Sequence, residues 1–158
     1  MCCKVFALPF LNKPAGAWCI HARETGCAIH DSDERHARCK TYACLWLSEA
    51  LGPMPDKFRP DRCRLTLTPR FRYKQAIVLF ASQAYDGAHL NNHYGAELVA
   101  ELVRNRHILV IGHAGNVCIA VNRTTFADWN ERDTEAVMKV LAAQDQATEM
   151  PPVANDTT

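Results

Sequence analysis

The chain has 158 residues, of which 48% are hydrophobic, and a formal net charge of +1 at pH 7. This length and apolar content suit one compact domain with a buried core, and two full domains would not fit comfortably. The near-neutral charge argues against a protein whose whole surface is devoted to nucleic acid. Pro9 and Pro14 break the apolar patch near the N-terminus, which is too short for a membrane span and unlike a signal peptide. We therefore expect a soluble, cytoplasmic protein with no membrane contact.

The first half of the chain predicts two short strands followed by a long helix. Residues 4–10 and residues 17–22 mix branched and aromatic side chains and predict the strands. Asp31 and Glu34 match a capping box, so a helix is expected to begin near residue 32. Gly52 and Pro53 end its pattern. Because residues 43–51 leave hardly any polar face, this helix should be buried on most sides and central to the fold.

The second half predicts a sheet. Alternating Leu and Thr residues from Leu65, and a continuous apolar run at 77–80, predict two strands separated near Pro69. Residues 83–95 are expected to be a loop, and residues 96–103 a short helix.

The clearest pattern is a β-hairpin. Residues 107–112 and 117–122 are rich in Val and Ile, and Gly and Asn residues lie between them. Asn130 or Thr134 is expected to cap a last amphipathic helix, and residues 147–158 should form a disordered tail. The predicted fold is a single α+β domain over residues 1–146, with a buried N-terminal helix packed on a mostly antiparallel sheet and with a C-terminal helix.

The chain contains eight cysteines. Without an export signal, reduced thiols, metal ligands or a catalytic thiol are better interpretations than a disulfide framework. Cys63 and Cys118 lie in strand-like patterns and are expected to be small buried hydrophobic residues.

Catalysis by a thiolate requires a cysteine near a histidine and a third group that orients the imidazole. The hairpin would place His107 beside Asn122, and the buried helix offers Cys44 or Cys39. His113 is an alternative base, and Cys39 an alternative nucleophile.

Two stretches resemble the papain-like cysteine peptidase superfamily: Tyr42–Gly52, with a cysteine on an apolar helix, and Arg106–Asn122, with a histidine on one strand and an asparagine ending the next. The resemblance implies cleavage of peptide or amide bonds through an acyl-enzyme. Cys44 would be the nucleophile, His107 the base and Asn122 the orienting residue, and the reaction would require no cofactor.

A second constellation predicts a metal site. Cys27 and His30 form one pair with two residues between them, and His36 and Cys39 form another. A Cys2His2 set satisfies tetrahedral Zn²⁺, and this spacing lets both members of a pair reach one ion. The alternative to an enzyme is therefore a zinc-stabilised binding module. A non-enzymatic inhibitor or adaptor is a third hypothesis.

The most basic stretch extends from Lys57 to Lys74. On a regular strand, Arg70, Arg72 and Lys74 would share one face, with Phe71 and Tyr73 on the other. Such a face could contact nucleic-acid phosphates or an acidic partner protein.

Overall fold

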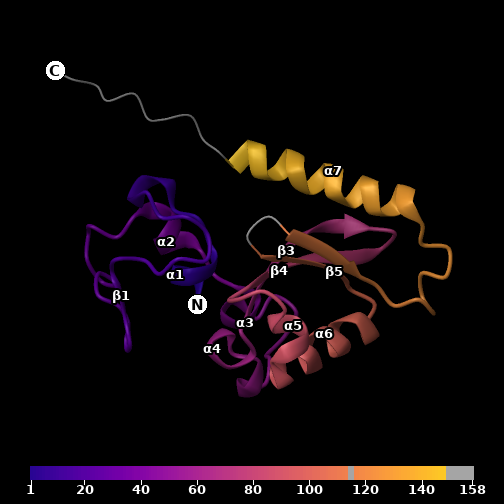
Figure 1. The fold of residues 1–158 in the computed structure, drawn as a ribbon, viewed down its shortest axis with the longest axis horizontal. Helices are drawn as coiled ribbons and strands as arrows, with labels where there is room; N and C mark the ends of the chain where they lie inside the picture. The colour runs from indigo at the N-terminus through magenta and orange to yellow at the C-terminus, as the bar shows by residue number, and fades with distance from the viewer. Residues whose placement is uncertain (114–115, 149–158) are drawn as a thin grey trace. The chain divides into compact units, whose positions relative to one another are not determined.

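The computed structural model describes residues 1–113 and 116–148. The chain divides into two compact units, residues 1–122 and residues 123–158. Helices combined with a four-stranded sheet give the predicted α+β class (Figure 1). The expectation of one domain over residues 1–146 stays a prediction.

The four-stranded sheet has the order β3-β4-β5-β6. Its strands are β3 (Leu65–Tyr73), β4 (Ala76–Gln83), β5 (Ile108–His113) and β6 (Asn116–Ala120). Two of the pairings are antiparallel, as predicted, and β5 with β6 confirms the hairpin. β4 and β5 are parallel. A parallel pair needs a crossover connection, which is formed here by α5 (Ala88–Asn91) and α6 (His93–Arg104).

The predicted break at Pro69 is wrong, because β3 continues through this residue with an irregularity before Phe71. β3 is an edge strand, where the missing N–H of proline costs no hydrogen bond. The chain reverses instead at Lys74 and Gln75, which both have positive φ, at 44° and 65°. Two such residues between paired strands form a type I′ turn, whose twist matches that of the strands.

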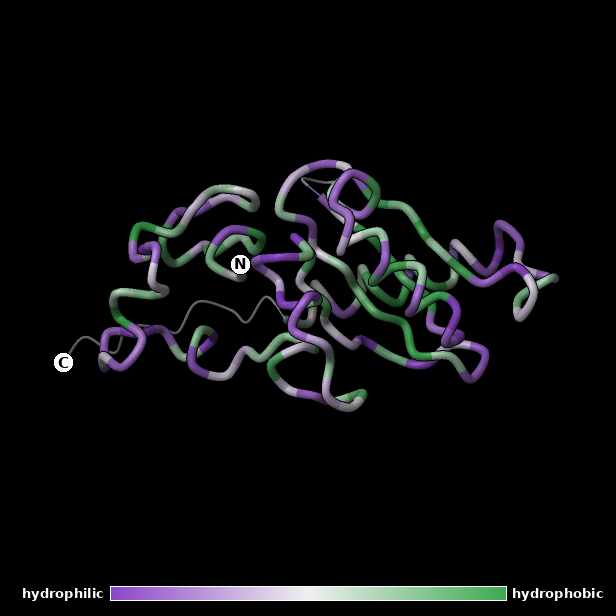
Figure 2. Tube along the Cα trace, turned by 90° about the horizontal axis from the view of Figure 1, so that it is seen from below, coloured by the Kyte–Doolittle hydropathy of each residue, from purple (hydrophilic) through white to green (hydrophobic). Residues whose placement is uncertain are grey.

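One face of the sheet is covered by α3 (Leu45–Ser48), α4 (Pro60–Cys63), α5 and α6, which lie on the same side in Figure 1. Figure 2, in which hydrophobic residues are green, shows apolar stretches along the extended segments of the chain. The core on this side consists of Leu45, Phe58, Cys63, Leu65, Leu67, Leu79, Ala81, Ala88, Leu98, Leu102, Leu109 and Ile111. Burial of these apolar side chains holds the helices against the sheet, and some of these helices contribute residues to the candidate site.

The long buried helix expected from residue 32 to 51 does not form. Two short helices, α2 (Ala37–Thr41) and α3, are separated by extended backbone at Tyr42 and Cys44. The Tyr42 hydroxyl forms a hydrogen bond with Thr68 Oγ1 (3.2 Å), which ties this break to the sheet. Leu47 is 65% exposed, and α3 ends at Glu49 in the left-handed conformation. Tertiary contacts therefore overrode the local helical pattern.

The expected strands at 4–10 and 17–22 are also wrong. The chain forms α1 (Cys2–Val5), the 3-10 helix η1 (Pro9–Leu11), and a small ladder of β1 (Ala22–Arg23) with β2 (Gly26–Cys27). Lys13 organises the loop, since its side chain is 7% exposed and donates to the carbonyl oxygens of Lys4, Phe6 and Pro14. A buried ammonium needs such acceptors, and they hold the loop in place of a ladder.

In the second unit, α7 (Glu131–Thr148) is the predicted C-terminal helix. Asn130 caps it, because its Oδ1 accepts a hydrogen bond from Arg132 N (2.9 Å). The helix extends two residues into the segment expected to be a tail, and residues 149–158 lie outside the described residues. None of the helices in the described residues combines the length and apolar character that a membrane crossing requires.

Candidate functional site

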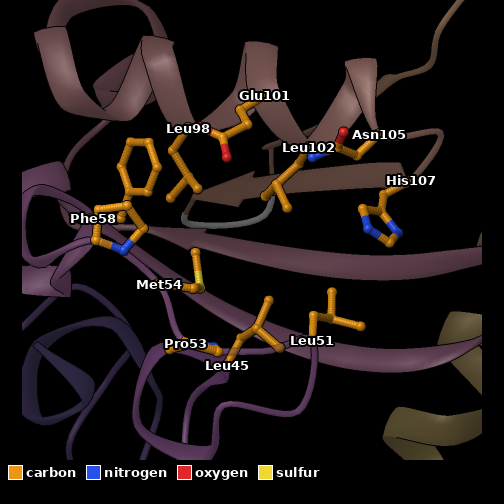
Figure 3. A pocket seen from close by; sticks show the side chains of 11 residues that line it. Leu45, Leu51, Pro53, Met54, Phe58, Leu98, Glu101, Leu102, Asn105 and His107 are labelled. Carbon is orange, nitrogen blue, oxygen red and sulfur yellow. The ribbon is translucent and has the colours of Figure 1, made fainter.

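A cavity of about 120 Å³ lies between the segment 45–58 and the junction of α6 with β5 (Figure 3). Three polar residues line it, namely Glu101, Asn105 and His107. The remaining lining is apolar and consists of Leu45, Leu51, Pro53, Met54, Pro55, Phe58, Leu98 and Leu102. A cavity that combines apolar side chains with a few polar groups is typical of small-molecule binding sites.

The end of α6 positions His107. Arg106 N donates to Val103 O (3.1 Å), and His107 N donates to Leu102 O (3.1 Å). Arg106 itself has φ 66°. These two bonds around a left-handed residue form a Schellman motif, which commonly ends a helix and brings the following residue back against the last turns. His107 and Leu102 therefore line the same cavity.

The imidazole of His107 is electrically neutral at neutral pH. Burial lowers the pKa of His107 from its ordinary value of 6.5. Its Nδ1 is buried and has no hydrogen-bond partner among the described residues. A buried ring nitrogen without a partner is costly, so a hydrogen-bonding partner for this atom would stabilise the protein.

The opposite wall is the segment 49–58, which turns at Glu49 (φ 51°) and Gly52 (φ 91°). It ends in the 3-10 helix η2 (Asp56–Phe58). Lys57 forms an ion pair with Glu97 of α6, so the two walls are linked beside the cavity. Phe58 is 2% exposed and anchors this segment in the core.

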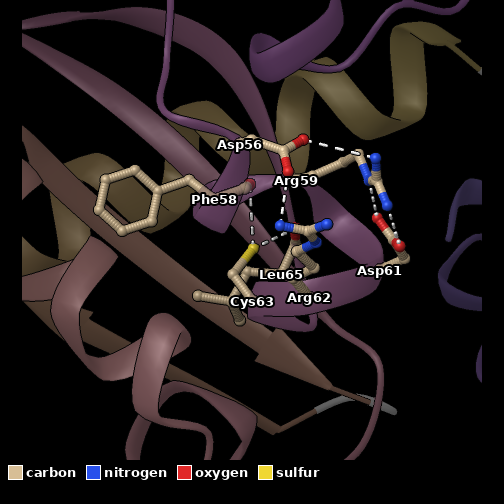
Figure 4. A network of polar contacts seen from close by, with 7 residues as sticks. All are labelled: Asp56, Phe58, Arg59, Asp61, Arg62, Cys63 and Leu65. Atoms are coloured by element: carbon tan, nitrogen blue, oxygen red, sulfur yellow. Dashed lines mark hydrogen bonds and ion pairs between the residues drawn. The ribbon is translucent and has the colours of Figure 1, made fainter.

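A polar network fixes η2 against α4 (Figure 4). Arg59 donates to both carboxylate oxygens of Asp61, from Nε (2.6 Å) and Nη2 (3.0 Å), and the guanidinium lowers the pKa of Asp61. The Cys63 Sγ lies 3.2 Å from the carbonyl oxygen of Phe58 and 3.5 Å from that of Leu65, so its single S–H has two acceptors within reach. Burial raises the pKa of Cys63 to about 11. Cys63 is thus the buried core residue that was predicted, although it lies in a helix.

The predicted catalytic residues are only partly brought together. Cys44 is buried at the N-cap of α3, and it is the following residue, Leu45, that lines the cavity with His107. No hydrogen bond joins Cys44 to His107 in the described part of the chain. β5 and β6 pair Leu109 with Ala120, and continuing this register by two residues would place His107 opposite Asn122.

The alternative catalytic residues lie elsewhere. Cys39 is half-buried in α2, and Arg35 donates to its carbonyl oxygen. His113 ends β5, and its Nδ1 donates to Gln83 O (3.2 Å). Cys118 was expected in the core but is exposed on the edge strand β6.

The structure does not gather the predicted zinc ligands. Within residues 1–113 and 116–148, no group of three or more His, Cys, Asp or Glu side chains could hold a metal ion. Cys27 lies in β2 and Cys39 in α2, while His30 Nδ1 lies 2.7 Å from its neighbour Asp31. His36 Nδ1 accepts from Arg38 N (3.2 Å) and its ring stacks on Phe10. The zinc site stays a prediction.

The prediction that Arg70, Arg72 and Lys74 share one face of a strand is wrong. The irregularity between Pro69 and Phe71 shifts the alternation of side chains, so Arg70 lies over the ring of Phe80 (5.5 Å). Arg72 instead pairs with Ile77, and Lys74 lies in the turn. A β-bulge has this effect because it inserts one residue into one strand only.

Two lining residues, Glu101 and Asn105, were missed by the sequence analysis. With Leu98 and Leu102 they follow the spacing of one helix face, so extending the predicted helix by two residues to Asn105 would have placed all four side by side. No family model matches this chain, and no curated protein or solved structure matches it either. The resemblance to papain-like cysteine peptidases is therefore still a prediction.

Proposed function

We propose that this protein binds a small molecule that has an apolar part and a hydrogen-bonding group, and that His107 recognises that group. The observation that carries the proposal is that His107 lines the cavity and that its buried Nδ1 has no partner among the described residues. Leaving a buried polar atom unpaired costs roughly 1–3 kcal/mol. A ligand hydroxyl or amide would remove this cost, whereas a hydrocarbon would not.

The size and charge of the cavity narrow the ligand class. An apolar protein cavity of about 150 Å³ holds one benzene molecule, so the volume of about 120 Å³ suits a ligand no larger than a single substituted ring, or one group of a larger molecule. The Glu101 carboxylate and the neutral His107 disfavour an anion. We therefore expect an uncharged ligand such as a small phenol or alcohol.

The test compares phenol with toluene, which have similar shapes but differ in the hydroxyl group. Binding is measured by NMR titration of the wild-type protein and of His107→Leu. One net hydrogen bond of about 0.5–1.5 kcal/mol predicts that phenol binds roughly 2- to 12-fold more tightly than toluene in the wild type. This preference should vanish in His107→Leu.

His93→Leu is the matched control, because His93 is exposed and does not line the cavity. It should keep the preference for phenol. Failure of both ligands to shift resonances of α6, or an unchanged preference in His107→Leu, would overturn the proposal.

A second candidate function is the thiol-dependent hydrolysis of peptide or amide bonds. It is favoured by the position of Cys44. The next residue, Leu45, lines the cavity, and His107 lines the same cavity. His107 would accept the thiol proton while Sγ bonds to the carbonyl carbon, and the leaving group would depart with that proton. Water would then hydrolyse the thioester.

This candidate is tested with p-nitrophenyl acetate, whose acylation of a thiol releases p-nitrophenol in a burst. Cys44→Ala should abolish the burst, and Cys118→Ala should leave it unchanged. Cys118 is the appropriate control because it is exposed, while partial burial and the nearby Asp86 raise the pKa of its thiol. A burst that survives in Cys44→Ala would rule Cys44 out as the nucleophile.

A further inference from the structure

Two histidines contact the same residue, Gln83, at the carboxyl ends of the parallel strands. β4 and β5 are paired up to Ser82 and Gly112, so Gln83 and His113 follow at the same edge of the sheet. His89 lies in α5, six residues beyond the end of β4. The carboxyl ends of adjacent parallel strands are where open sheets place their ligand sites.

Gln83 anchors both imidazoles. Its side-chain Oε1 accepts from the backbone N–H of His89 (3.1 Å), which identifies that atom as the amide oxygen, and it lies 2.7 Å from His89 Nδ1. The backbone oxygen of Gln83 accepts from His113 Nδ1 (3.2 Å). Because each acceptor is an oxygen, Nδ1 carries the proton in both rings.

The consequence is that both neutral rings keep a lone pair on Nε2. Metal-binding histidines show this arrangement, in which one ring N–H donates to a carbonyl and the other nitrogen binds the ion. Gln83 is only 4% exposed, so the residue that anchors both imidazoles is itself fixed by the residues packed around it. His89 and His113 are half-buried, which leaves them accessible to a small ion.

We propose that His89 and His113 bind a divalent transition-metal ion through their Nε2 atoms. No third His, Cys, Asp or Glu side chain of the described residues completes a metal group, so water would fill the remaining positions. Imidazole ligands favour copper, nickel and zinc over calcium or magnesium. With two protein ligands, the site binds more weakly than a four-ligand structural zinc site. The proposal is independent of the cavity and of the predicted Cys/His segment.

The test uses paramagnetic Ni²⁺, which broadens NMR signals near the ion and does not oxidise the thiols as Cu²⁺ would. In the full-length, reduced wild-type protein, broadening should centre on the backbone amides of residues 82–89 and 110–113. This readout needs no variant. Broadening centred on residues 27–39 instead would overturn the proposal.

Variants then assign the ligands. His89→Asn or His113→Asn should abolish the broadening at residues 82–89. Gln83→Leu removes the side-chain anchor but neither imidazole, and loss of such an outer partner typically weakens metal affinity by about 10- to 100-fold. His93→Asn is the matched control and should have no effect. Broadening that survives in both His89→Asn and His113→Asn would overturn the assignment.

Discussion

Replacing Gly95 with alanine tests how closely α6 must approach its neighbours. Gly95 is buried in the first turn of α6. A Cβ atom at this position would lie 2.7 Å from the carbonyl oxygen of Ala88 and 2.7 Å from that of Cys63. Non-bonded carbon and oxygen atoms ordinarily stay about 3.3 Å or more apart. Each contact would therefore have to lengthen by about 0.6 Å.

Two effects oppose each other in this variant. Alanine is favoured over glycine in a helix by about 1 kcal/mol, whereas overpacking costs about 1–3 kcal/mol. The crowded atoms are backbone oxygens of two separate segments, and Ala88 O already accepts a hydrogen bond from Asn92 N (3.1 Å). They cannot rotate away as a side chain would, so the steric cost should be at the upper end. We expect a net loss of about 1–2 kcal/mol, or roughly 2–8 °C in Tm.

The assay is thermal and urea unfolding of three proteins: wild type, Gly95→Ala and Ala100→Gly. Ala100 is exposed in the same helix, so its variant measures the helix-propensity term alone and should lose about 1 kcal/mol. Without steric conflict, Gly95→Ala would gain a similar amount. A stability of Gly95→Ala equal to or above that of wild type would therefore refute the close approach of α6.

Three further predictions concern the turn, a titration and the metal. Lys74→Asn combined with Gln75→Gly should stabilise the protein by about 1–2 kcal/mol in urea unfolding, since both positions have positive φ; an unchanged midpoint would contradict the type I′ turn. Because the pKa of His107 is lowered in the folded state, folding favours the neutral imidazole. The contribution of His107 to the free energy of unfolding is therefore complete above pH 6.5 and is lost as the pH falls below that value. Wild type should therefore lose stability relative to His107→Leu as the pH falls from 7.5 to 5, and a constant difference between the two proteins would count against burial of the ring. The third prediction concerns the sequence-predicted zinc ligands Cys27, His30, His36 and Cys39. If they bind zinc, metal analysis of the reduced protein will give one ion per chain, which chelation removes with loss of structure in this segment; reduced protein that takes up no zinc would exclude the site.

The parts of the fold that the sequence predicted correctly depend on local signals. The Val- and Ile-rich runs of β5 and β6 have no competing helical period, so their pairing followed from composition and turn residues. Asn130 could be assigned as a cap because the capping hydrogen bond spans only two residues. Such features require no knowledge of distant parts of the chain.

The errors arose where distant residues decide the local conformation. The apolar residues after Tyr42 fit a buried helix, but Tyr42 has an extended backbone and bonds to Thr68 of the sheet, and Leu45 is fully buried whereas Leu47 is exposed. The same reasoning explains the site. His107 was identified from its residue type, whereas its partners in the cavity come from segments 45–58 and 98–105, which only the folded chain brings together.

The two proposed sites are separate because they lie at opposite ends of β5. β5 begins directly after His107 and ends at His113, and six residues of extended strand span about 20 Å. Effects at sites more than about 10 Å apart with no shared partner usually add. His107→Leu should therefore leave the Ni²⁺ broadening unchanged, and His89→Asn should leave the binding of phenol unchanged. A loss of both properties in either variant would instead mean that β5 itself had been disturbed, so each variant serves as the folding control for the other site.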